Sequence, residues 1–310
     1  MTEKFSFGVD IGGMSVKFGL FSSISGLLEK WKIPTDRRNA GQNVLSDIVK
    51  SMREHMDSRD YVGMGVGVPG PVTEKRWVDR VVNIGWGRTD LGGFLQNALS
   101  MPVICMNDAN AAAIGEMWRG GGIGFQDMVL MTLGTGVGGG IILGRNIVEG
   151  AHGSAGELGH MQVEPAETRR CTCGNCGCLE YYASATGLSR LTRDYLLKHD
   201  EPSALRSLEE ITARNVWDLS KQGDAAAEKI TDLYCKYLGR GAAAIAAAFD
   251  PQAFIIGGGV ANAGKPLIDG MRRWFLKYAF PSCAATDFCL ASLGNDAGIY
   301  GCAYEILRMV

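Results

Sequence analysis

Four cysteines stand within eight residues in the stretch CTCGNCGC, at Cys171, Cys173, Cys176 and Cys178. Thiolates gathered this tightly are typical ligands of zinc, and unrelated free thiols would rarely be spaced so closely. The chain opens into KFSFGVDIGG with no signal-peptide pattern, so we expect a reducing cytoplasm, in which a disulfide framework is disfavoured. The residues alone leave open whether the loop supplies all four ligands or needs one from elsewhere.

Glycines directly follow apolar, strand-like runs in three stretches, DIGGMS (10–15), LGTGVGGG (133–140) and IIGGGVA (255–261). Without a Cβ, backbone N–H groups at such turns can approach an anion closely. Tight hairpins also use paired glycines, yet three such turns in one chain favour binding of nucleotide phosphates. No Gly-x-x-x-x-Gly-Lys-Ser/Thr loop is present, and GTGVGG lies between two strands, so neither a P-loop nor a dinucleotide fingerprint is predicted.

Two aspartates stand at positions suited to phosphoryl chemistry. Asp10 ends the first strand beside the Gly12-Gly13 turn, where its carboxylate could hold Mg²⁺ against phosphate oxygens; the alternative is a turn cap. Asp108, in NDANAAA (107–113), stands where a strand meets a helix. Spacing alone favours a helix N-cap there over a general base, and the positive end of a helix would keep the carboxylate ionised in either role.

The elements that must position these residues alternate between strands and helices. Strands are predicted at 5–11, 15–21, 61–68, 102–106, 127–134, 136–144 and in the strand-turn unit 253–260, and helices at about 41–57, 107–118, 185–198, 224–249 and 296–307. Each half begins with a hairpin whose turn is rich in glycine, which predicts two α/β domains joined near RGGGIGF (119–125). We place a small domain at 1–118, completed by the C-terminal helix (296–310), and a larger domain at 119–295.

The composition is that of an ordinary globular chain, with 310 residues, 46% of them hydrophobic and 21% charged. The formal net charge of −2 gives no indication of nucleic acid or an anionic membrane as a partner. The longest apolar run, GAAAIAAAF (241–249), is too short to span a bilayer.

The motifs DIGG, LGTGVGGG and IIGGGV, in this order, resemble the phosphate-1, phosphate-2 and adenosine motifs of the actin-like sugar-kinase ATPases. The stretch EGAHGSAGELGHM (149–161), followed by CTCGNCGCLE (171–180), narrows the resemblance to the ROK family (repressors, open reading frames and kinases) over nearly the whole chain. Within that family the chain is most similar to bacterial glucokinases. The resemblance implies an α/β, two-domain actin-like (ribonuclease H-like) fold with an interdomain cleft, and ATP-dependent phosphorylation of a hexose such as glucose to glucose 6-phosphate.

The resemblance also implies roles for individual residues. NDANAAA matches the segment that carries the catalytic aspartate of the family, so Asp108 becomes the expected general base. The expected sugar-binding residues are Asn107, Asp108, Glu157, His160 and Glu180, together with Gly70 in VPGP and Asn83 in NIGW. The expected ATP and Mg²⁺ residues are Asp10, Gly12, Gly13, Gly134, Thr135, Gly136, Gly257, Gly258 and Gly259.

The family pattern Cys-x-Cys-Gly-x-x-Gly-Cys-Leu-Glu leaves Cys176 at a variable position. The resemblance therefore implies a structural Zn²⁺ held by His160, Cys171, Cys173 and Cys178. With one nitrogen of His160 on zinc, the other N–H would face a sugar hydroxyl. One departure is Met14, which stands where the family usually has Thr after the paired glycines; we expect the turn to survive, and Ser15 could substitute for the missing hydroxyl.

Two alternatives remain to the glucokinase interpretation. One is a kinase for N-acetylmannosamine or another hexose, which the shared motifs do not separate from a glucokinase. The other is a noncatalytic ROK sugar sensor or repressor; it is disfavoured because only residues 1–4 precede the first strand, too few for a helix-turn-helix, and because Asp108 is present. The expected partners are a small sugar and a second copy of the chain, with no nucleic acid and no membrane.

Overall fold

The N-terminal half is built on a five-stranded mixed sheet. In the computed structural model, which describes residues 3–79, 81 and 83–309, the sheet order is β3-β2-β1-β4-β8. Its strands are β1 (Phe5–Ile11), β2 (Ser15–Ser22), β3 (Gly26–Pro34), β4 (Tyr61–Val68) and β8 (Val103–Asn107). Strands β1 and β3 both pair antiparallel with β2, and β4 and β8 run parallel to β1. The predicted hairpin around Gly12-Gly13 is confirmed.

A second five-stranded sheet forms the other half, in the order β11-β10-β9-β12-β13. Its strands are β9 (Met128–Leu133), β10 (Val137–Leu143), β11 (Asn146–Ile147), β12 (Ala253–Gly257) and β13 (Asp287–Leu290). As in the first sheet, it starts from an antiparallel hairpin, β9–β10, and adds parallel neighbours, β12 and β13. Three short strands, β5 (Val72–Thr73), β6 (Trp77–Val78) and β7 (Thr89–Asp90), make a separate small sheet.

Helices cover both sheets. The α-helices are α1 (Val44–His55), α2 (Leu91–Leu99), α3 (Asp108–Arg119), α4 (Leu179–Ala183), α5 (Ala185–Lys198), α6 (Ala213–Lys221), α7 (Ala225–Phe249), α8 (Lys265–Tyr278) and α9 (Ala297–Leu307). Short 3₁₀ turns lie at Arg38–Gly41, Leu158–His160, Ala204–Ser207, Gly259–Ala263, Pro281–Ala285 and Gly294–Asp296. No helix of the described residues is both long and apolar enough to cross a bilayer.

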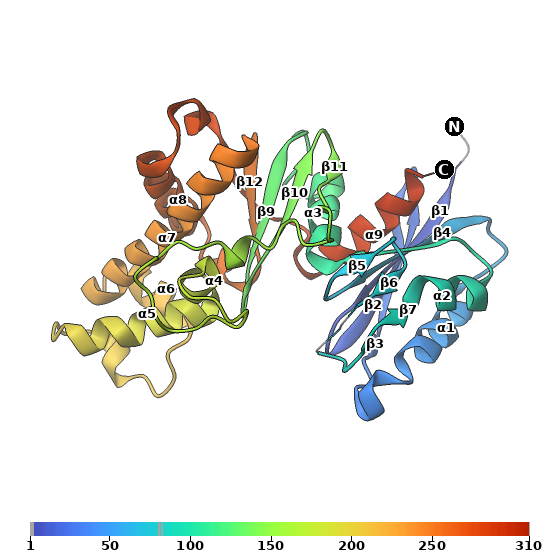
Figure 1. Cartoon of the computed structure of the whole chain (residues 1–310), viewed down its shortest axis with the longest axis horizontal. Coiled ribbons are helices and arrows are strands. Elements are labelled where there is room, and N and C mark those ends of the chain that lie inside the picture. The colour runs from blue at the N-terminus through green and yellow to red at the C-terminus, as the bar shows by residue number, and fades with distance from the viewer. Residues whose placement is uncertain (1–2, 80, 82, 310) are drawn as a thin grey trace.

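Helices α3 and α9 lie between the two sheets and pack on each other (Figure 1). They touch backbone to backbone, because a Cβ on Gly115 would overlap the Ala297 carbonyl and one on Gly301 would overlap the Ala111 carbonyl. Although α9 is the last helix of the chain, it packs on β1 and β4 of the N-terminal sheet. The division at 118/119, with a C-terminal completion of the first half, remains a prediction.

Sequence patterns missed β3, α2, α6 and α8. Strand β3 lies at the edge of its sheet, and several of its side chains, including Lys30, are exposed, so no clear apolar alternation marks it. Helix α2 contains two glycines, Gly92 and Gly93, which lower its intrinsic helix propensity. Buried leucines on α2, Leu91 and Leu95, hold it in place through tertiary packing.

Candidate active site and metal loop

A cleft of about 540 Å³ brings the expected sugar residues together. Its lining includes Gly70, Asn83, Asn107, Asp108, Glu157, His160 and Glu180, all seven of the residues assigned to the sugar. Gly134, Gly136 and Gly258 from the glycine turns of the second sheet complete another wall. The cleft therefore joins residues from β8, α3, the 3₁₀ turn at 158–160 and α4 with two of the three glycine turns.

Asn107, and not Asp108, caps helix α3. The carboxamide oxygen of Asn107 accepts hydrogen bonds from the N–H groups of Ala109 (2.9 Å) and Asn110 (3.1 Å), and its amide nitrogen donates to the Gly70 carbonyl (3.3 Å). The cap favoured for Asp108 on spacing alone is therefore wrong by one residue. Asn107 satisfies the helix end and so leaves the Asp108 carboxylate available to the cleft.

Asp108 occupies the first helical position of α3, where its Oδ1 accepts from the Ala109 N–H (2.9 Å). Burial, helped by the negative charge of Asp10, raises the pKa of Asp108 to about 6. A carboxylate with a pKa near neutrality can accept a proton during a reaction and release it afterwards, which is what a general base must do.

Glu157 and His160 lie three residues apart at the two ends of a single 3₁₀ turn, with His160 Nε2 3.9 Å from Glu157 Oε2. Glu180 lies in the first turn of α4, two residues after Cys178. Its Oε2 accepts from the Val137 N–H (3.0 Å) and its Oε1 from the Thr172 hydroxyl (2.8 Å). These side chains present acceptors and a donor to the cleft, which is the chemistry that sugar hydroxyls require.

His160, Cys171, Cys173 and Cys178 form a compact donor cluster, with their ligand atoms all within 4.8 Å of one another. The Sγ atoms of Cys173 and Cys178 are 3.7 Å apart, and Cys171 Sγ lies 3.8 Å from His160 Nδ1. Bonds of about 2.3 Å to a tetrahedral zinc would place two sulfurs roughly 3.8 Å apart. Donor types and spacing therefore fit a closed four-ligand zinc site.

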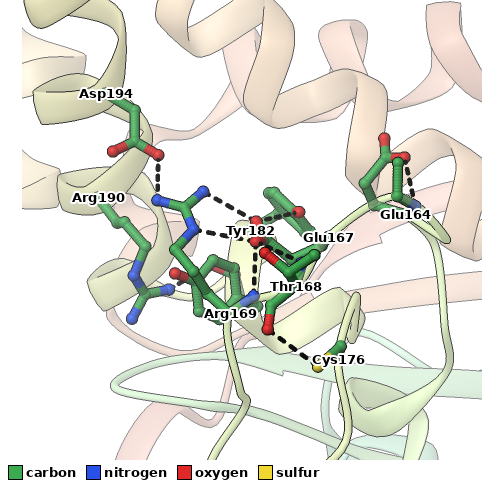
Figure 2. A network of polar contacts seen from close by, with 10 residues as sticks. Glu164, Glu167, Thr168, Arg169, Cys176, Tyr182, Arg190 and Asp194 are labelled. Atoms are coloured by element: carbon green, nitrogen blue, oxygen red, sulfur yellow. Dashed lines mark hydrogen bonds and ion pairs between the residues drawn. The ribbon is translucent and has the colours of Figure 1, made fainter.

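Cys176 faces a different neighbour. Its thiol donates to the Thr168 carbonyl (3.4 Å), a contact drawn in Figure 2, and the residue pairs with Arg170 in an isolated bridge. Cys176 is not part of the donor cluster found among the described residues. These contacts join Cys176 to the segment 168–170, which precedes the donor cluster in the chain; this face of the loop is called its outer side.

A polar network ties this outer side of the loop to helices α4 and α5 (Figure 2). Arg169 donates to both carboxylate oxygens of Glu167 (3.0 and 2.8 Å) and to Asp194 of α5 (2.7 Å). The Tyr182 hydroxyl of α4 donates to the same Glu167 (2.7 Å). Bidentate pairing of this kind fixes orientation as well as distance, so the loop is held against both helices.

The first glycine turn lies beside Asp10 but outside the lining of the cleft. Asp10 Oδ2 is 3.2 Å from Lys17 Nζ, which also donates to the Asn295 carbonyl (2.8 Å). Burial raises the pKa of Asp10, and the Lys17 ammonium opposes that shift. Met14, at the tip of the turn, is 86% exposed, and the Gly12 N–H closes the turn by donating to the Ser15 carbonyl (3.0 Å).

Thr35 holds this turn from the neighbouring strand end. Its hydroxyl donates to the Gly12 carbonyl (2.6 Å) and its N–H to the Met14 carbonyl (3.0 Å). The turn thus keeps its shape without a hydroxyl at position 14. Sequence reasoning missed Thr35, because nothing in the local pattern shows that the end of β3 meets the turn.

A second cavity, of about 740 Å³, shares Gly134 with the cleft. It takes in two further predicted nucleotide residues, Thr135 and Gly259. Gly257, Gly12 and Gly13 line neither space. Helix α6, which the sequence analysis missed, supplies five other lining residues: Ala213, Arg214, Trp217, Asp218 and Lys221. The helical period of ARNVWDLSK is the signal that could have located them.

Comparisons with known proteins agree with this geometry. The chain is 38% identical over 311 residues to a glucokinase of Halalkalibacterium halodurans, which covers 97% of this chain and 94% of the relative. The structure superposes on a ROK family glucokinase from Streptomyces griseus, solved with glucose and AMPPNP, with a TM-score of 0.78, 32% identity and coverage of 98% and 99%. A ROK hexokinase from Thermus thermophilus matches with a TM-score of 0.83, 30% identity and coverage of 99% and 100%.

These solved structures confirm the expected α/β, two-domain actin-like ATPase fold. The family model described as "ROK family" matches residues 6–308, almost the full length. The resemblance drawn from the glycine turns and the cysteine loop is thereby confirmed, and the chain belongs to the ROK family.

Proposed function

We propose that this protein is an ATP-dependent hexose kinase that converts glucose to glucose 6-phosphate, with Asp108 as the general base. The observation that carries the proposal is the position of Asp108 in the cleft. Its carboxylate is half-buried among groups that suit sugar hydroxyls and has its pKa raised to about 6. The adjoining cavity, reached past Gly134, extends toward α6 and has room for a nucleotide.

In this proposal the sugar is held by Asn107, Glu157, His160 and Glu180, with its 6-hydroxyl toward Asp108. The Asp108 carboxylate accepts the hydroxyl proton as the sugar oxygen forms a bond to the γ-phosphorus of ATP. The bond between that phosphorus and the oxygen bridging to the β-phosphate breaks, and ADP leaves with the electron pair. Asp108 then releases its proton to solvent.

Two metal ions belong to the proposal. Asp10 and the neighbouring glycine turn would hold Mg²⁺-ATP, and the chemistry that the magnesium ion supplies is neutralisation of phosphate charge. His160, Cys171, Cys173 and Cys178 would hold a structural Zn²⁺, whose four-ligand shell leaves no position open for water. With His160 Nδ1 turned toward Cys171, Nε2 is the nitrogen left to face the sugar.

The proposal includes a cytoplasmic homodimer. The cytoplasmic location is supported by the free thiols, which suit a reducing compartment. The dimer is proposed because it is the usual state of the family. A kinase acting on N-acetylmannosamine or another hexose is the second candidate. A sugar sensor without catalysis is disfavoured because the cleft retains Asp108, a half-buried carboxylate with a raised pKa.

The test is a coupled ADP-release assay over glucose, mannose, fructose, N-acetylglucosamine and N-acetylmannosamine. We expect the highest kcat/KM with glucose. Asp108→Asn should lower kcat by about 10²–10⁴-fold, the usual contribution of a general base, while calorimetry still detects glucose binding.

Asp60→Asn, which changes an exposed aspartate far from the cleft lining, is the matched control and should behave as the wild type. A higher kcat/KM with an N-acetylhexosamine than with glucose would show that glucose is not the preferred substrate. Near-normal turnover by Asp108→Asn would remove the base assignment.

A further inference from the structure

We propose that Thr172, the residue between two cysteines of the donor cluster, is a positioning residue for the sugar-binding Glu180. This inference rests on the proposed function, because it assumes that Glu180 contacts the sugar. Thr172 is exposed. It is neither one of the expected sugar-binding residues nor a member of the donor cluster. Its hydroxyl donates to Glu180 Oε1 at 2.8 Å.

The Glu180 carboxylate is held at both oxygens by donors from different parts of the second half. Oε2 accepts from the Val137 N–H at the start of β10, and Oε1 accepts from the Thr172 hydroxyl and, at 3.7 Å, from the Cys171 thiol of the metal loop. A thiol that binds zinc is deprotonated, so with the metal bound Thr172 is the described donor that remains on Oε1. A carboxylate held at one oxygen can still rotate about that contact, whereas donors on both oxygens fix its plane. Thr172 therefore determines which lone pairs of Glu180 point into the cleft.

Close packing at the other oxygen supports this restraint. A Cβ on Gly136 would overlap Glu180 Oε2, so the carboxylate already lies against the backbone of the β9–β10 turn. The Glu180 carboxylate therefore cannot move closer to Gly136, and its hydrogen bond to Thr172 restrains the opposite oxygen. Together the two contacts restrict the orientation of the Glu180 side chain.

The loop that carries Thr172 is held by contacts on both sides of that residue. Cys171 and Cys173, its two neighbours in the chain, belong to the donor cluster, and Arg169 binds Glu167 and Asp194 (Figure 2). A hydroxyl mounted on a loop held in this way loses little conformational entropy when it forms its hydrogen bond. The metal loop therefore acts on the sugar pocket by a second route, in addition to His160.

The test compares Thr172→Val with the wild-type chain. Valine keeps the shape of threonine and removes the hydroxyl. We expect the Kd for glucose, measured by calorimetry without nucleotide, and the KM for glucose to rise about tenfold, the effect of losing one hydrogen bond to a charged group. The value of kcat should change by less than about twofold, and zinc content should stay at the wild-type level, because no donor atom of the cluster changes.

Thr172→Ser, which restores the hydroxyl, should recover most of the glucose affinity. Thr168→Val is the matched control in the same loop, since the contacts of Thr168 shown here come from its backbone. Wild-type glucose affinity in Thr172→Val, an equal loss in Thr168→Val, or loss of zinc together with affinity would overturn the inference while leaving the proposed function intact. A wild-type chain that binds no hexose would overturn the proposed function, and this inference with it.

Discussion

At the scale of single residues, the half-buried aspartates Asp10 and Asp108 have different surroundings. Lys17 lies 3.2 Å from Asp10 and favours the ionised form of that carboxylate. The hydrogen bonds that lower the pKa of Asp108 come from backbone N–H groups, and burial outweighs them. Asp10 has a cationic neighbour, and Asp108 forms no ion pair among the described residues. This difference suits Asp10 to binding a cation and Asp108 to accepting a proton.

This division predicts the pH dependence of the reaction. A general base works only when it is ionised, so kcat should be constant at neutral pH and fall below about pH 6, approaching a tenfold loss for each further pH unit. Raising the pH restores activity, because it deprotonates Asp108. The measurement is kcat at saturating glucose and ATP between pH 5 and 8, values that bracket the expected inflection.

Zinc content and circular dichroism at each pH serve as controls, since loss of metal or fold would also lower the rate. A profile that stays flat down to pH 5 with the fold intact would rule out the titration assigned to Asp108, whose pKa is about 6.

At the scale of elements, hairpins with glycine turns were predictable because both of their signals are local. An apolar run such as 5–11, a glycine pair and a second apolar run leave few alternatives to a hairpin. The metal loop was predictable in position but not in ligand set from its own residues. His160 lies 11 residues before Cys171, and local spacing cannot show that the two side chains meet. The family pattern supplied that link.

Contacts that depend on tertiary packing could not be predicted from the sequence. Thr35 meets the first glycine turn from a strand end 23 residues from Gly12, and Thr172 reaches Glu180 across the loop. Neither residue stands in a pattern that indicates a partner. Helix α6 shows the same limit: its helical period could have located the helix, but its place beside the second cavity depends on tertiary packing.

The ligand set makes a prediction about the whole loop. Cys176→Ser should retain about one zinc per chain, because the Cys176 thiol contacts the Thr168 carbonyl and lies outside the donor cluster. Cys178→Ser should lose zinc, since Cys178 is a cluster member and is buried. Metal analysis of both purified variants checks this. Release of zinc by Cys176→Ser would instead indicate a site made of the four cysteines.

At the scale of the whole molecule, the chain crosses between the two halves twice, and one buried side chain holds both crossings. Glu116 of α3 is 1% exposed. Its carboxylate accepts from the N–H of Gly121 (2.7 Å), where the chain leaves the first half. It also accepts from the N–H groups of Ser292 (3.0 Å) and Leu293 (2.9 Å), where the chain returns toward α9. The glycine-rich segment 119–125, where the two domains are expected to join, is therefore anchored near its start.

Glu116→Ala should consequently destabilise the fold. It leaves three backbone donors without their acceptor. Ser292 is exposed, and Gly121 and Leu293 are half-buried, so water can replace part of the loss, and the free energy of unfolding should fall by about 2–3 kcal/mol. Glu116→Gln keeps one oxygen acceptor but turns an N–H₂ group toward backbone donors, which should give an intermediate loss. Calorimetry should show the thermal midpoint of Glu116→Ala lowered by about 5–10 °C. Glu54→Ala, an exposed change on α1, is the control, and a Glu116→Ala midpoint equal to that of this control would show that the crossings are held by other contacts.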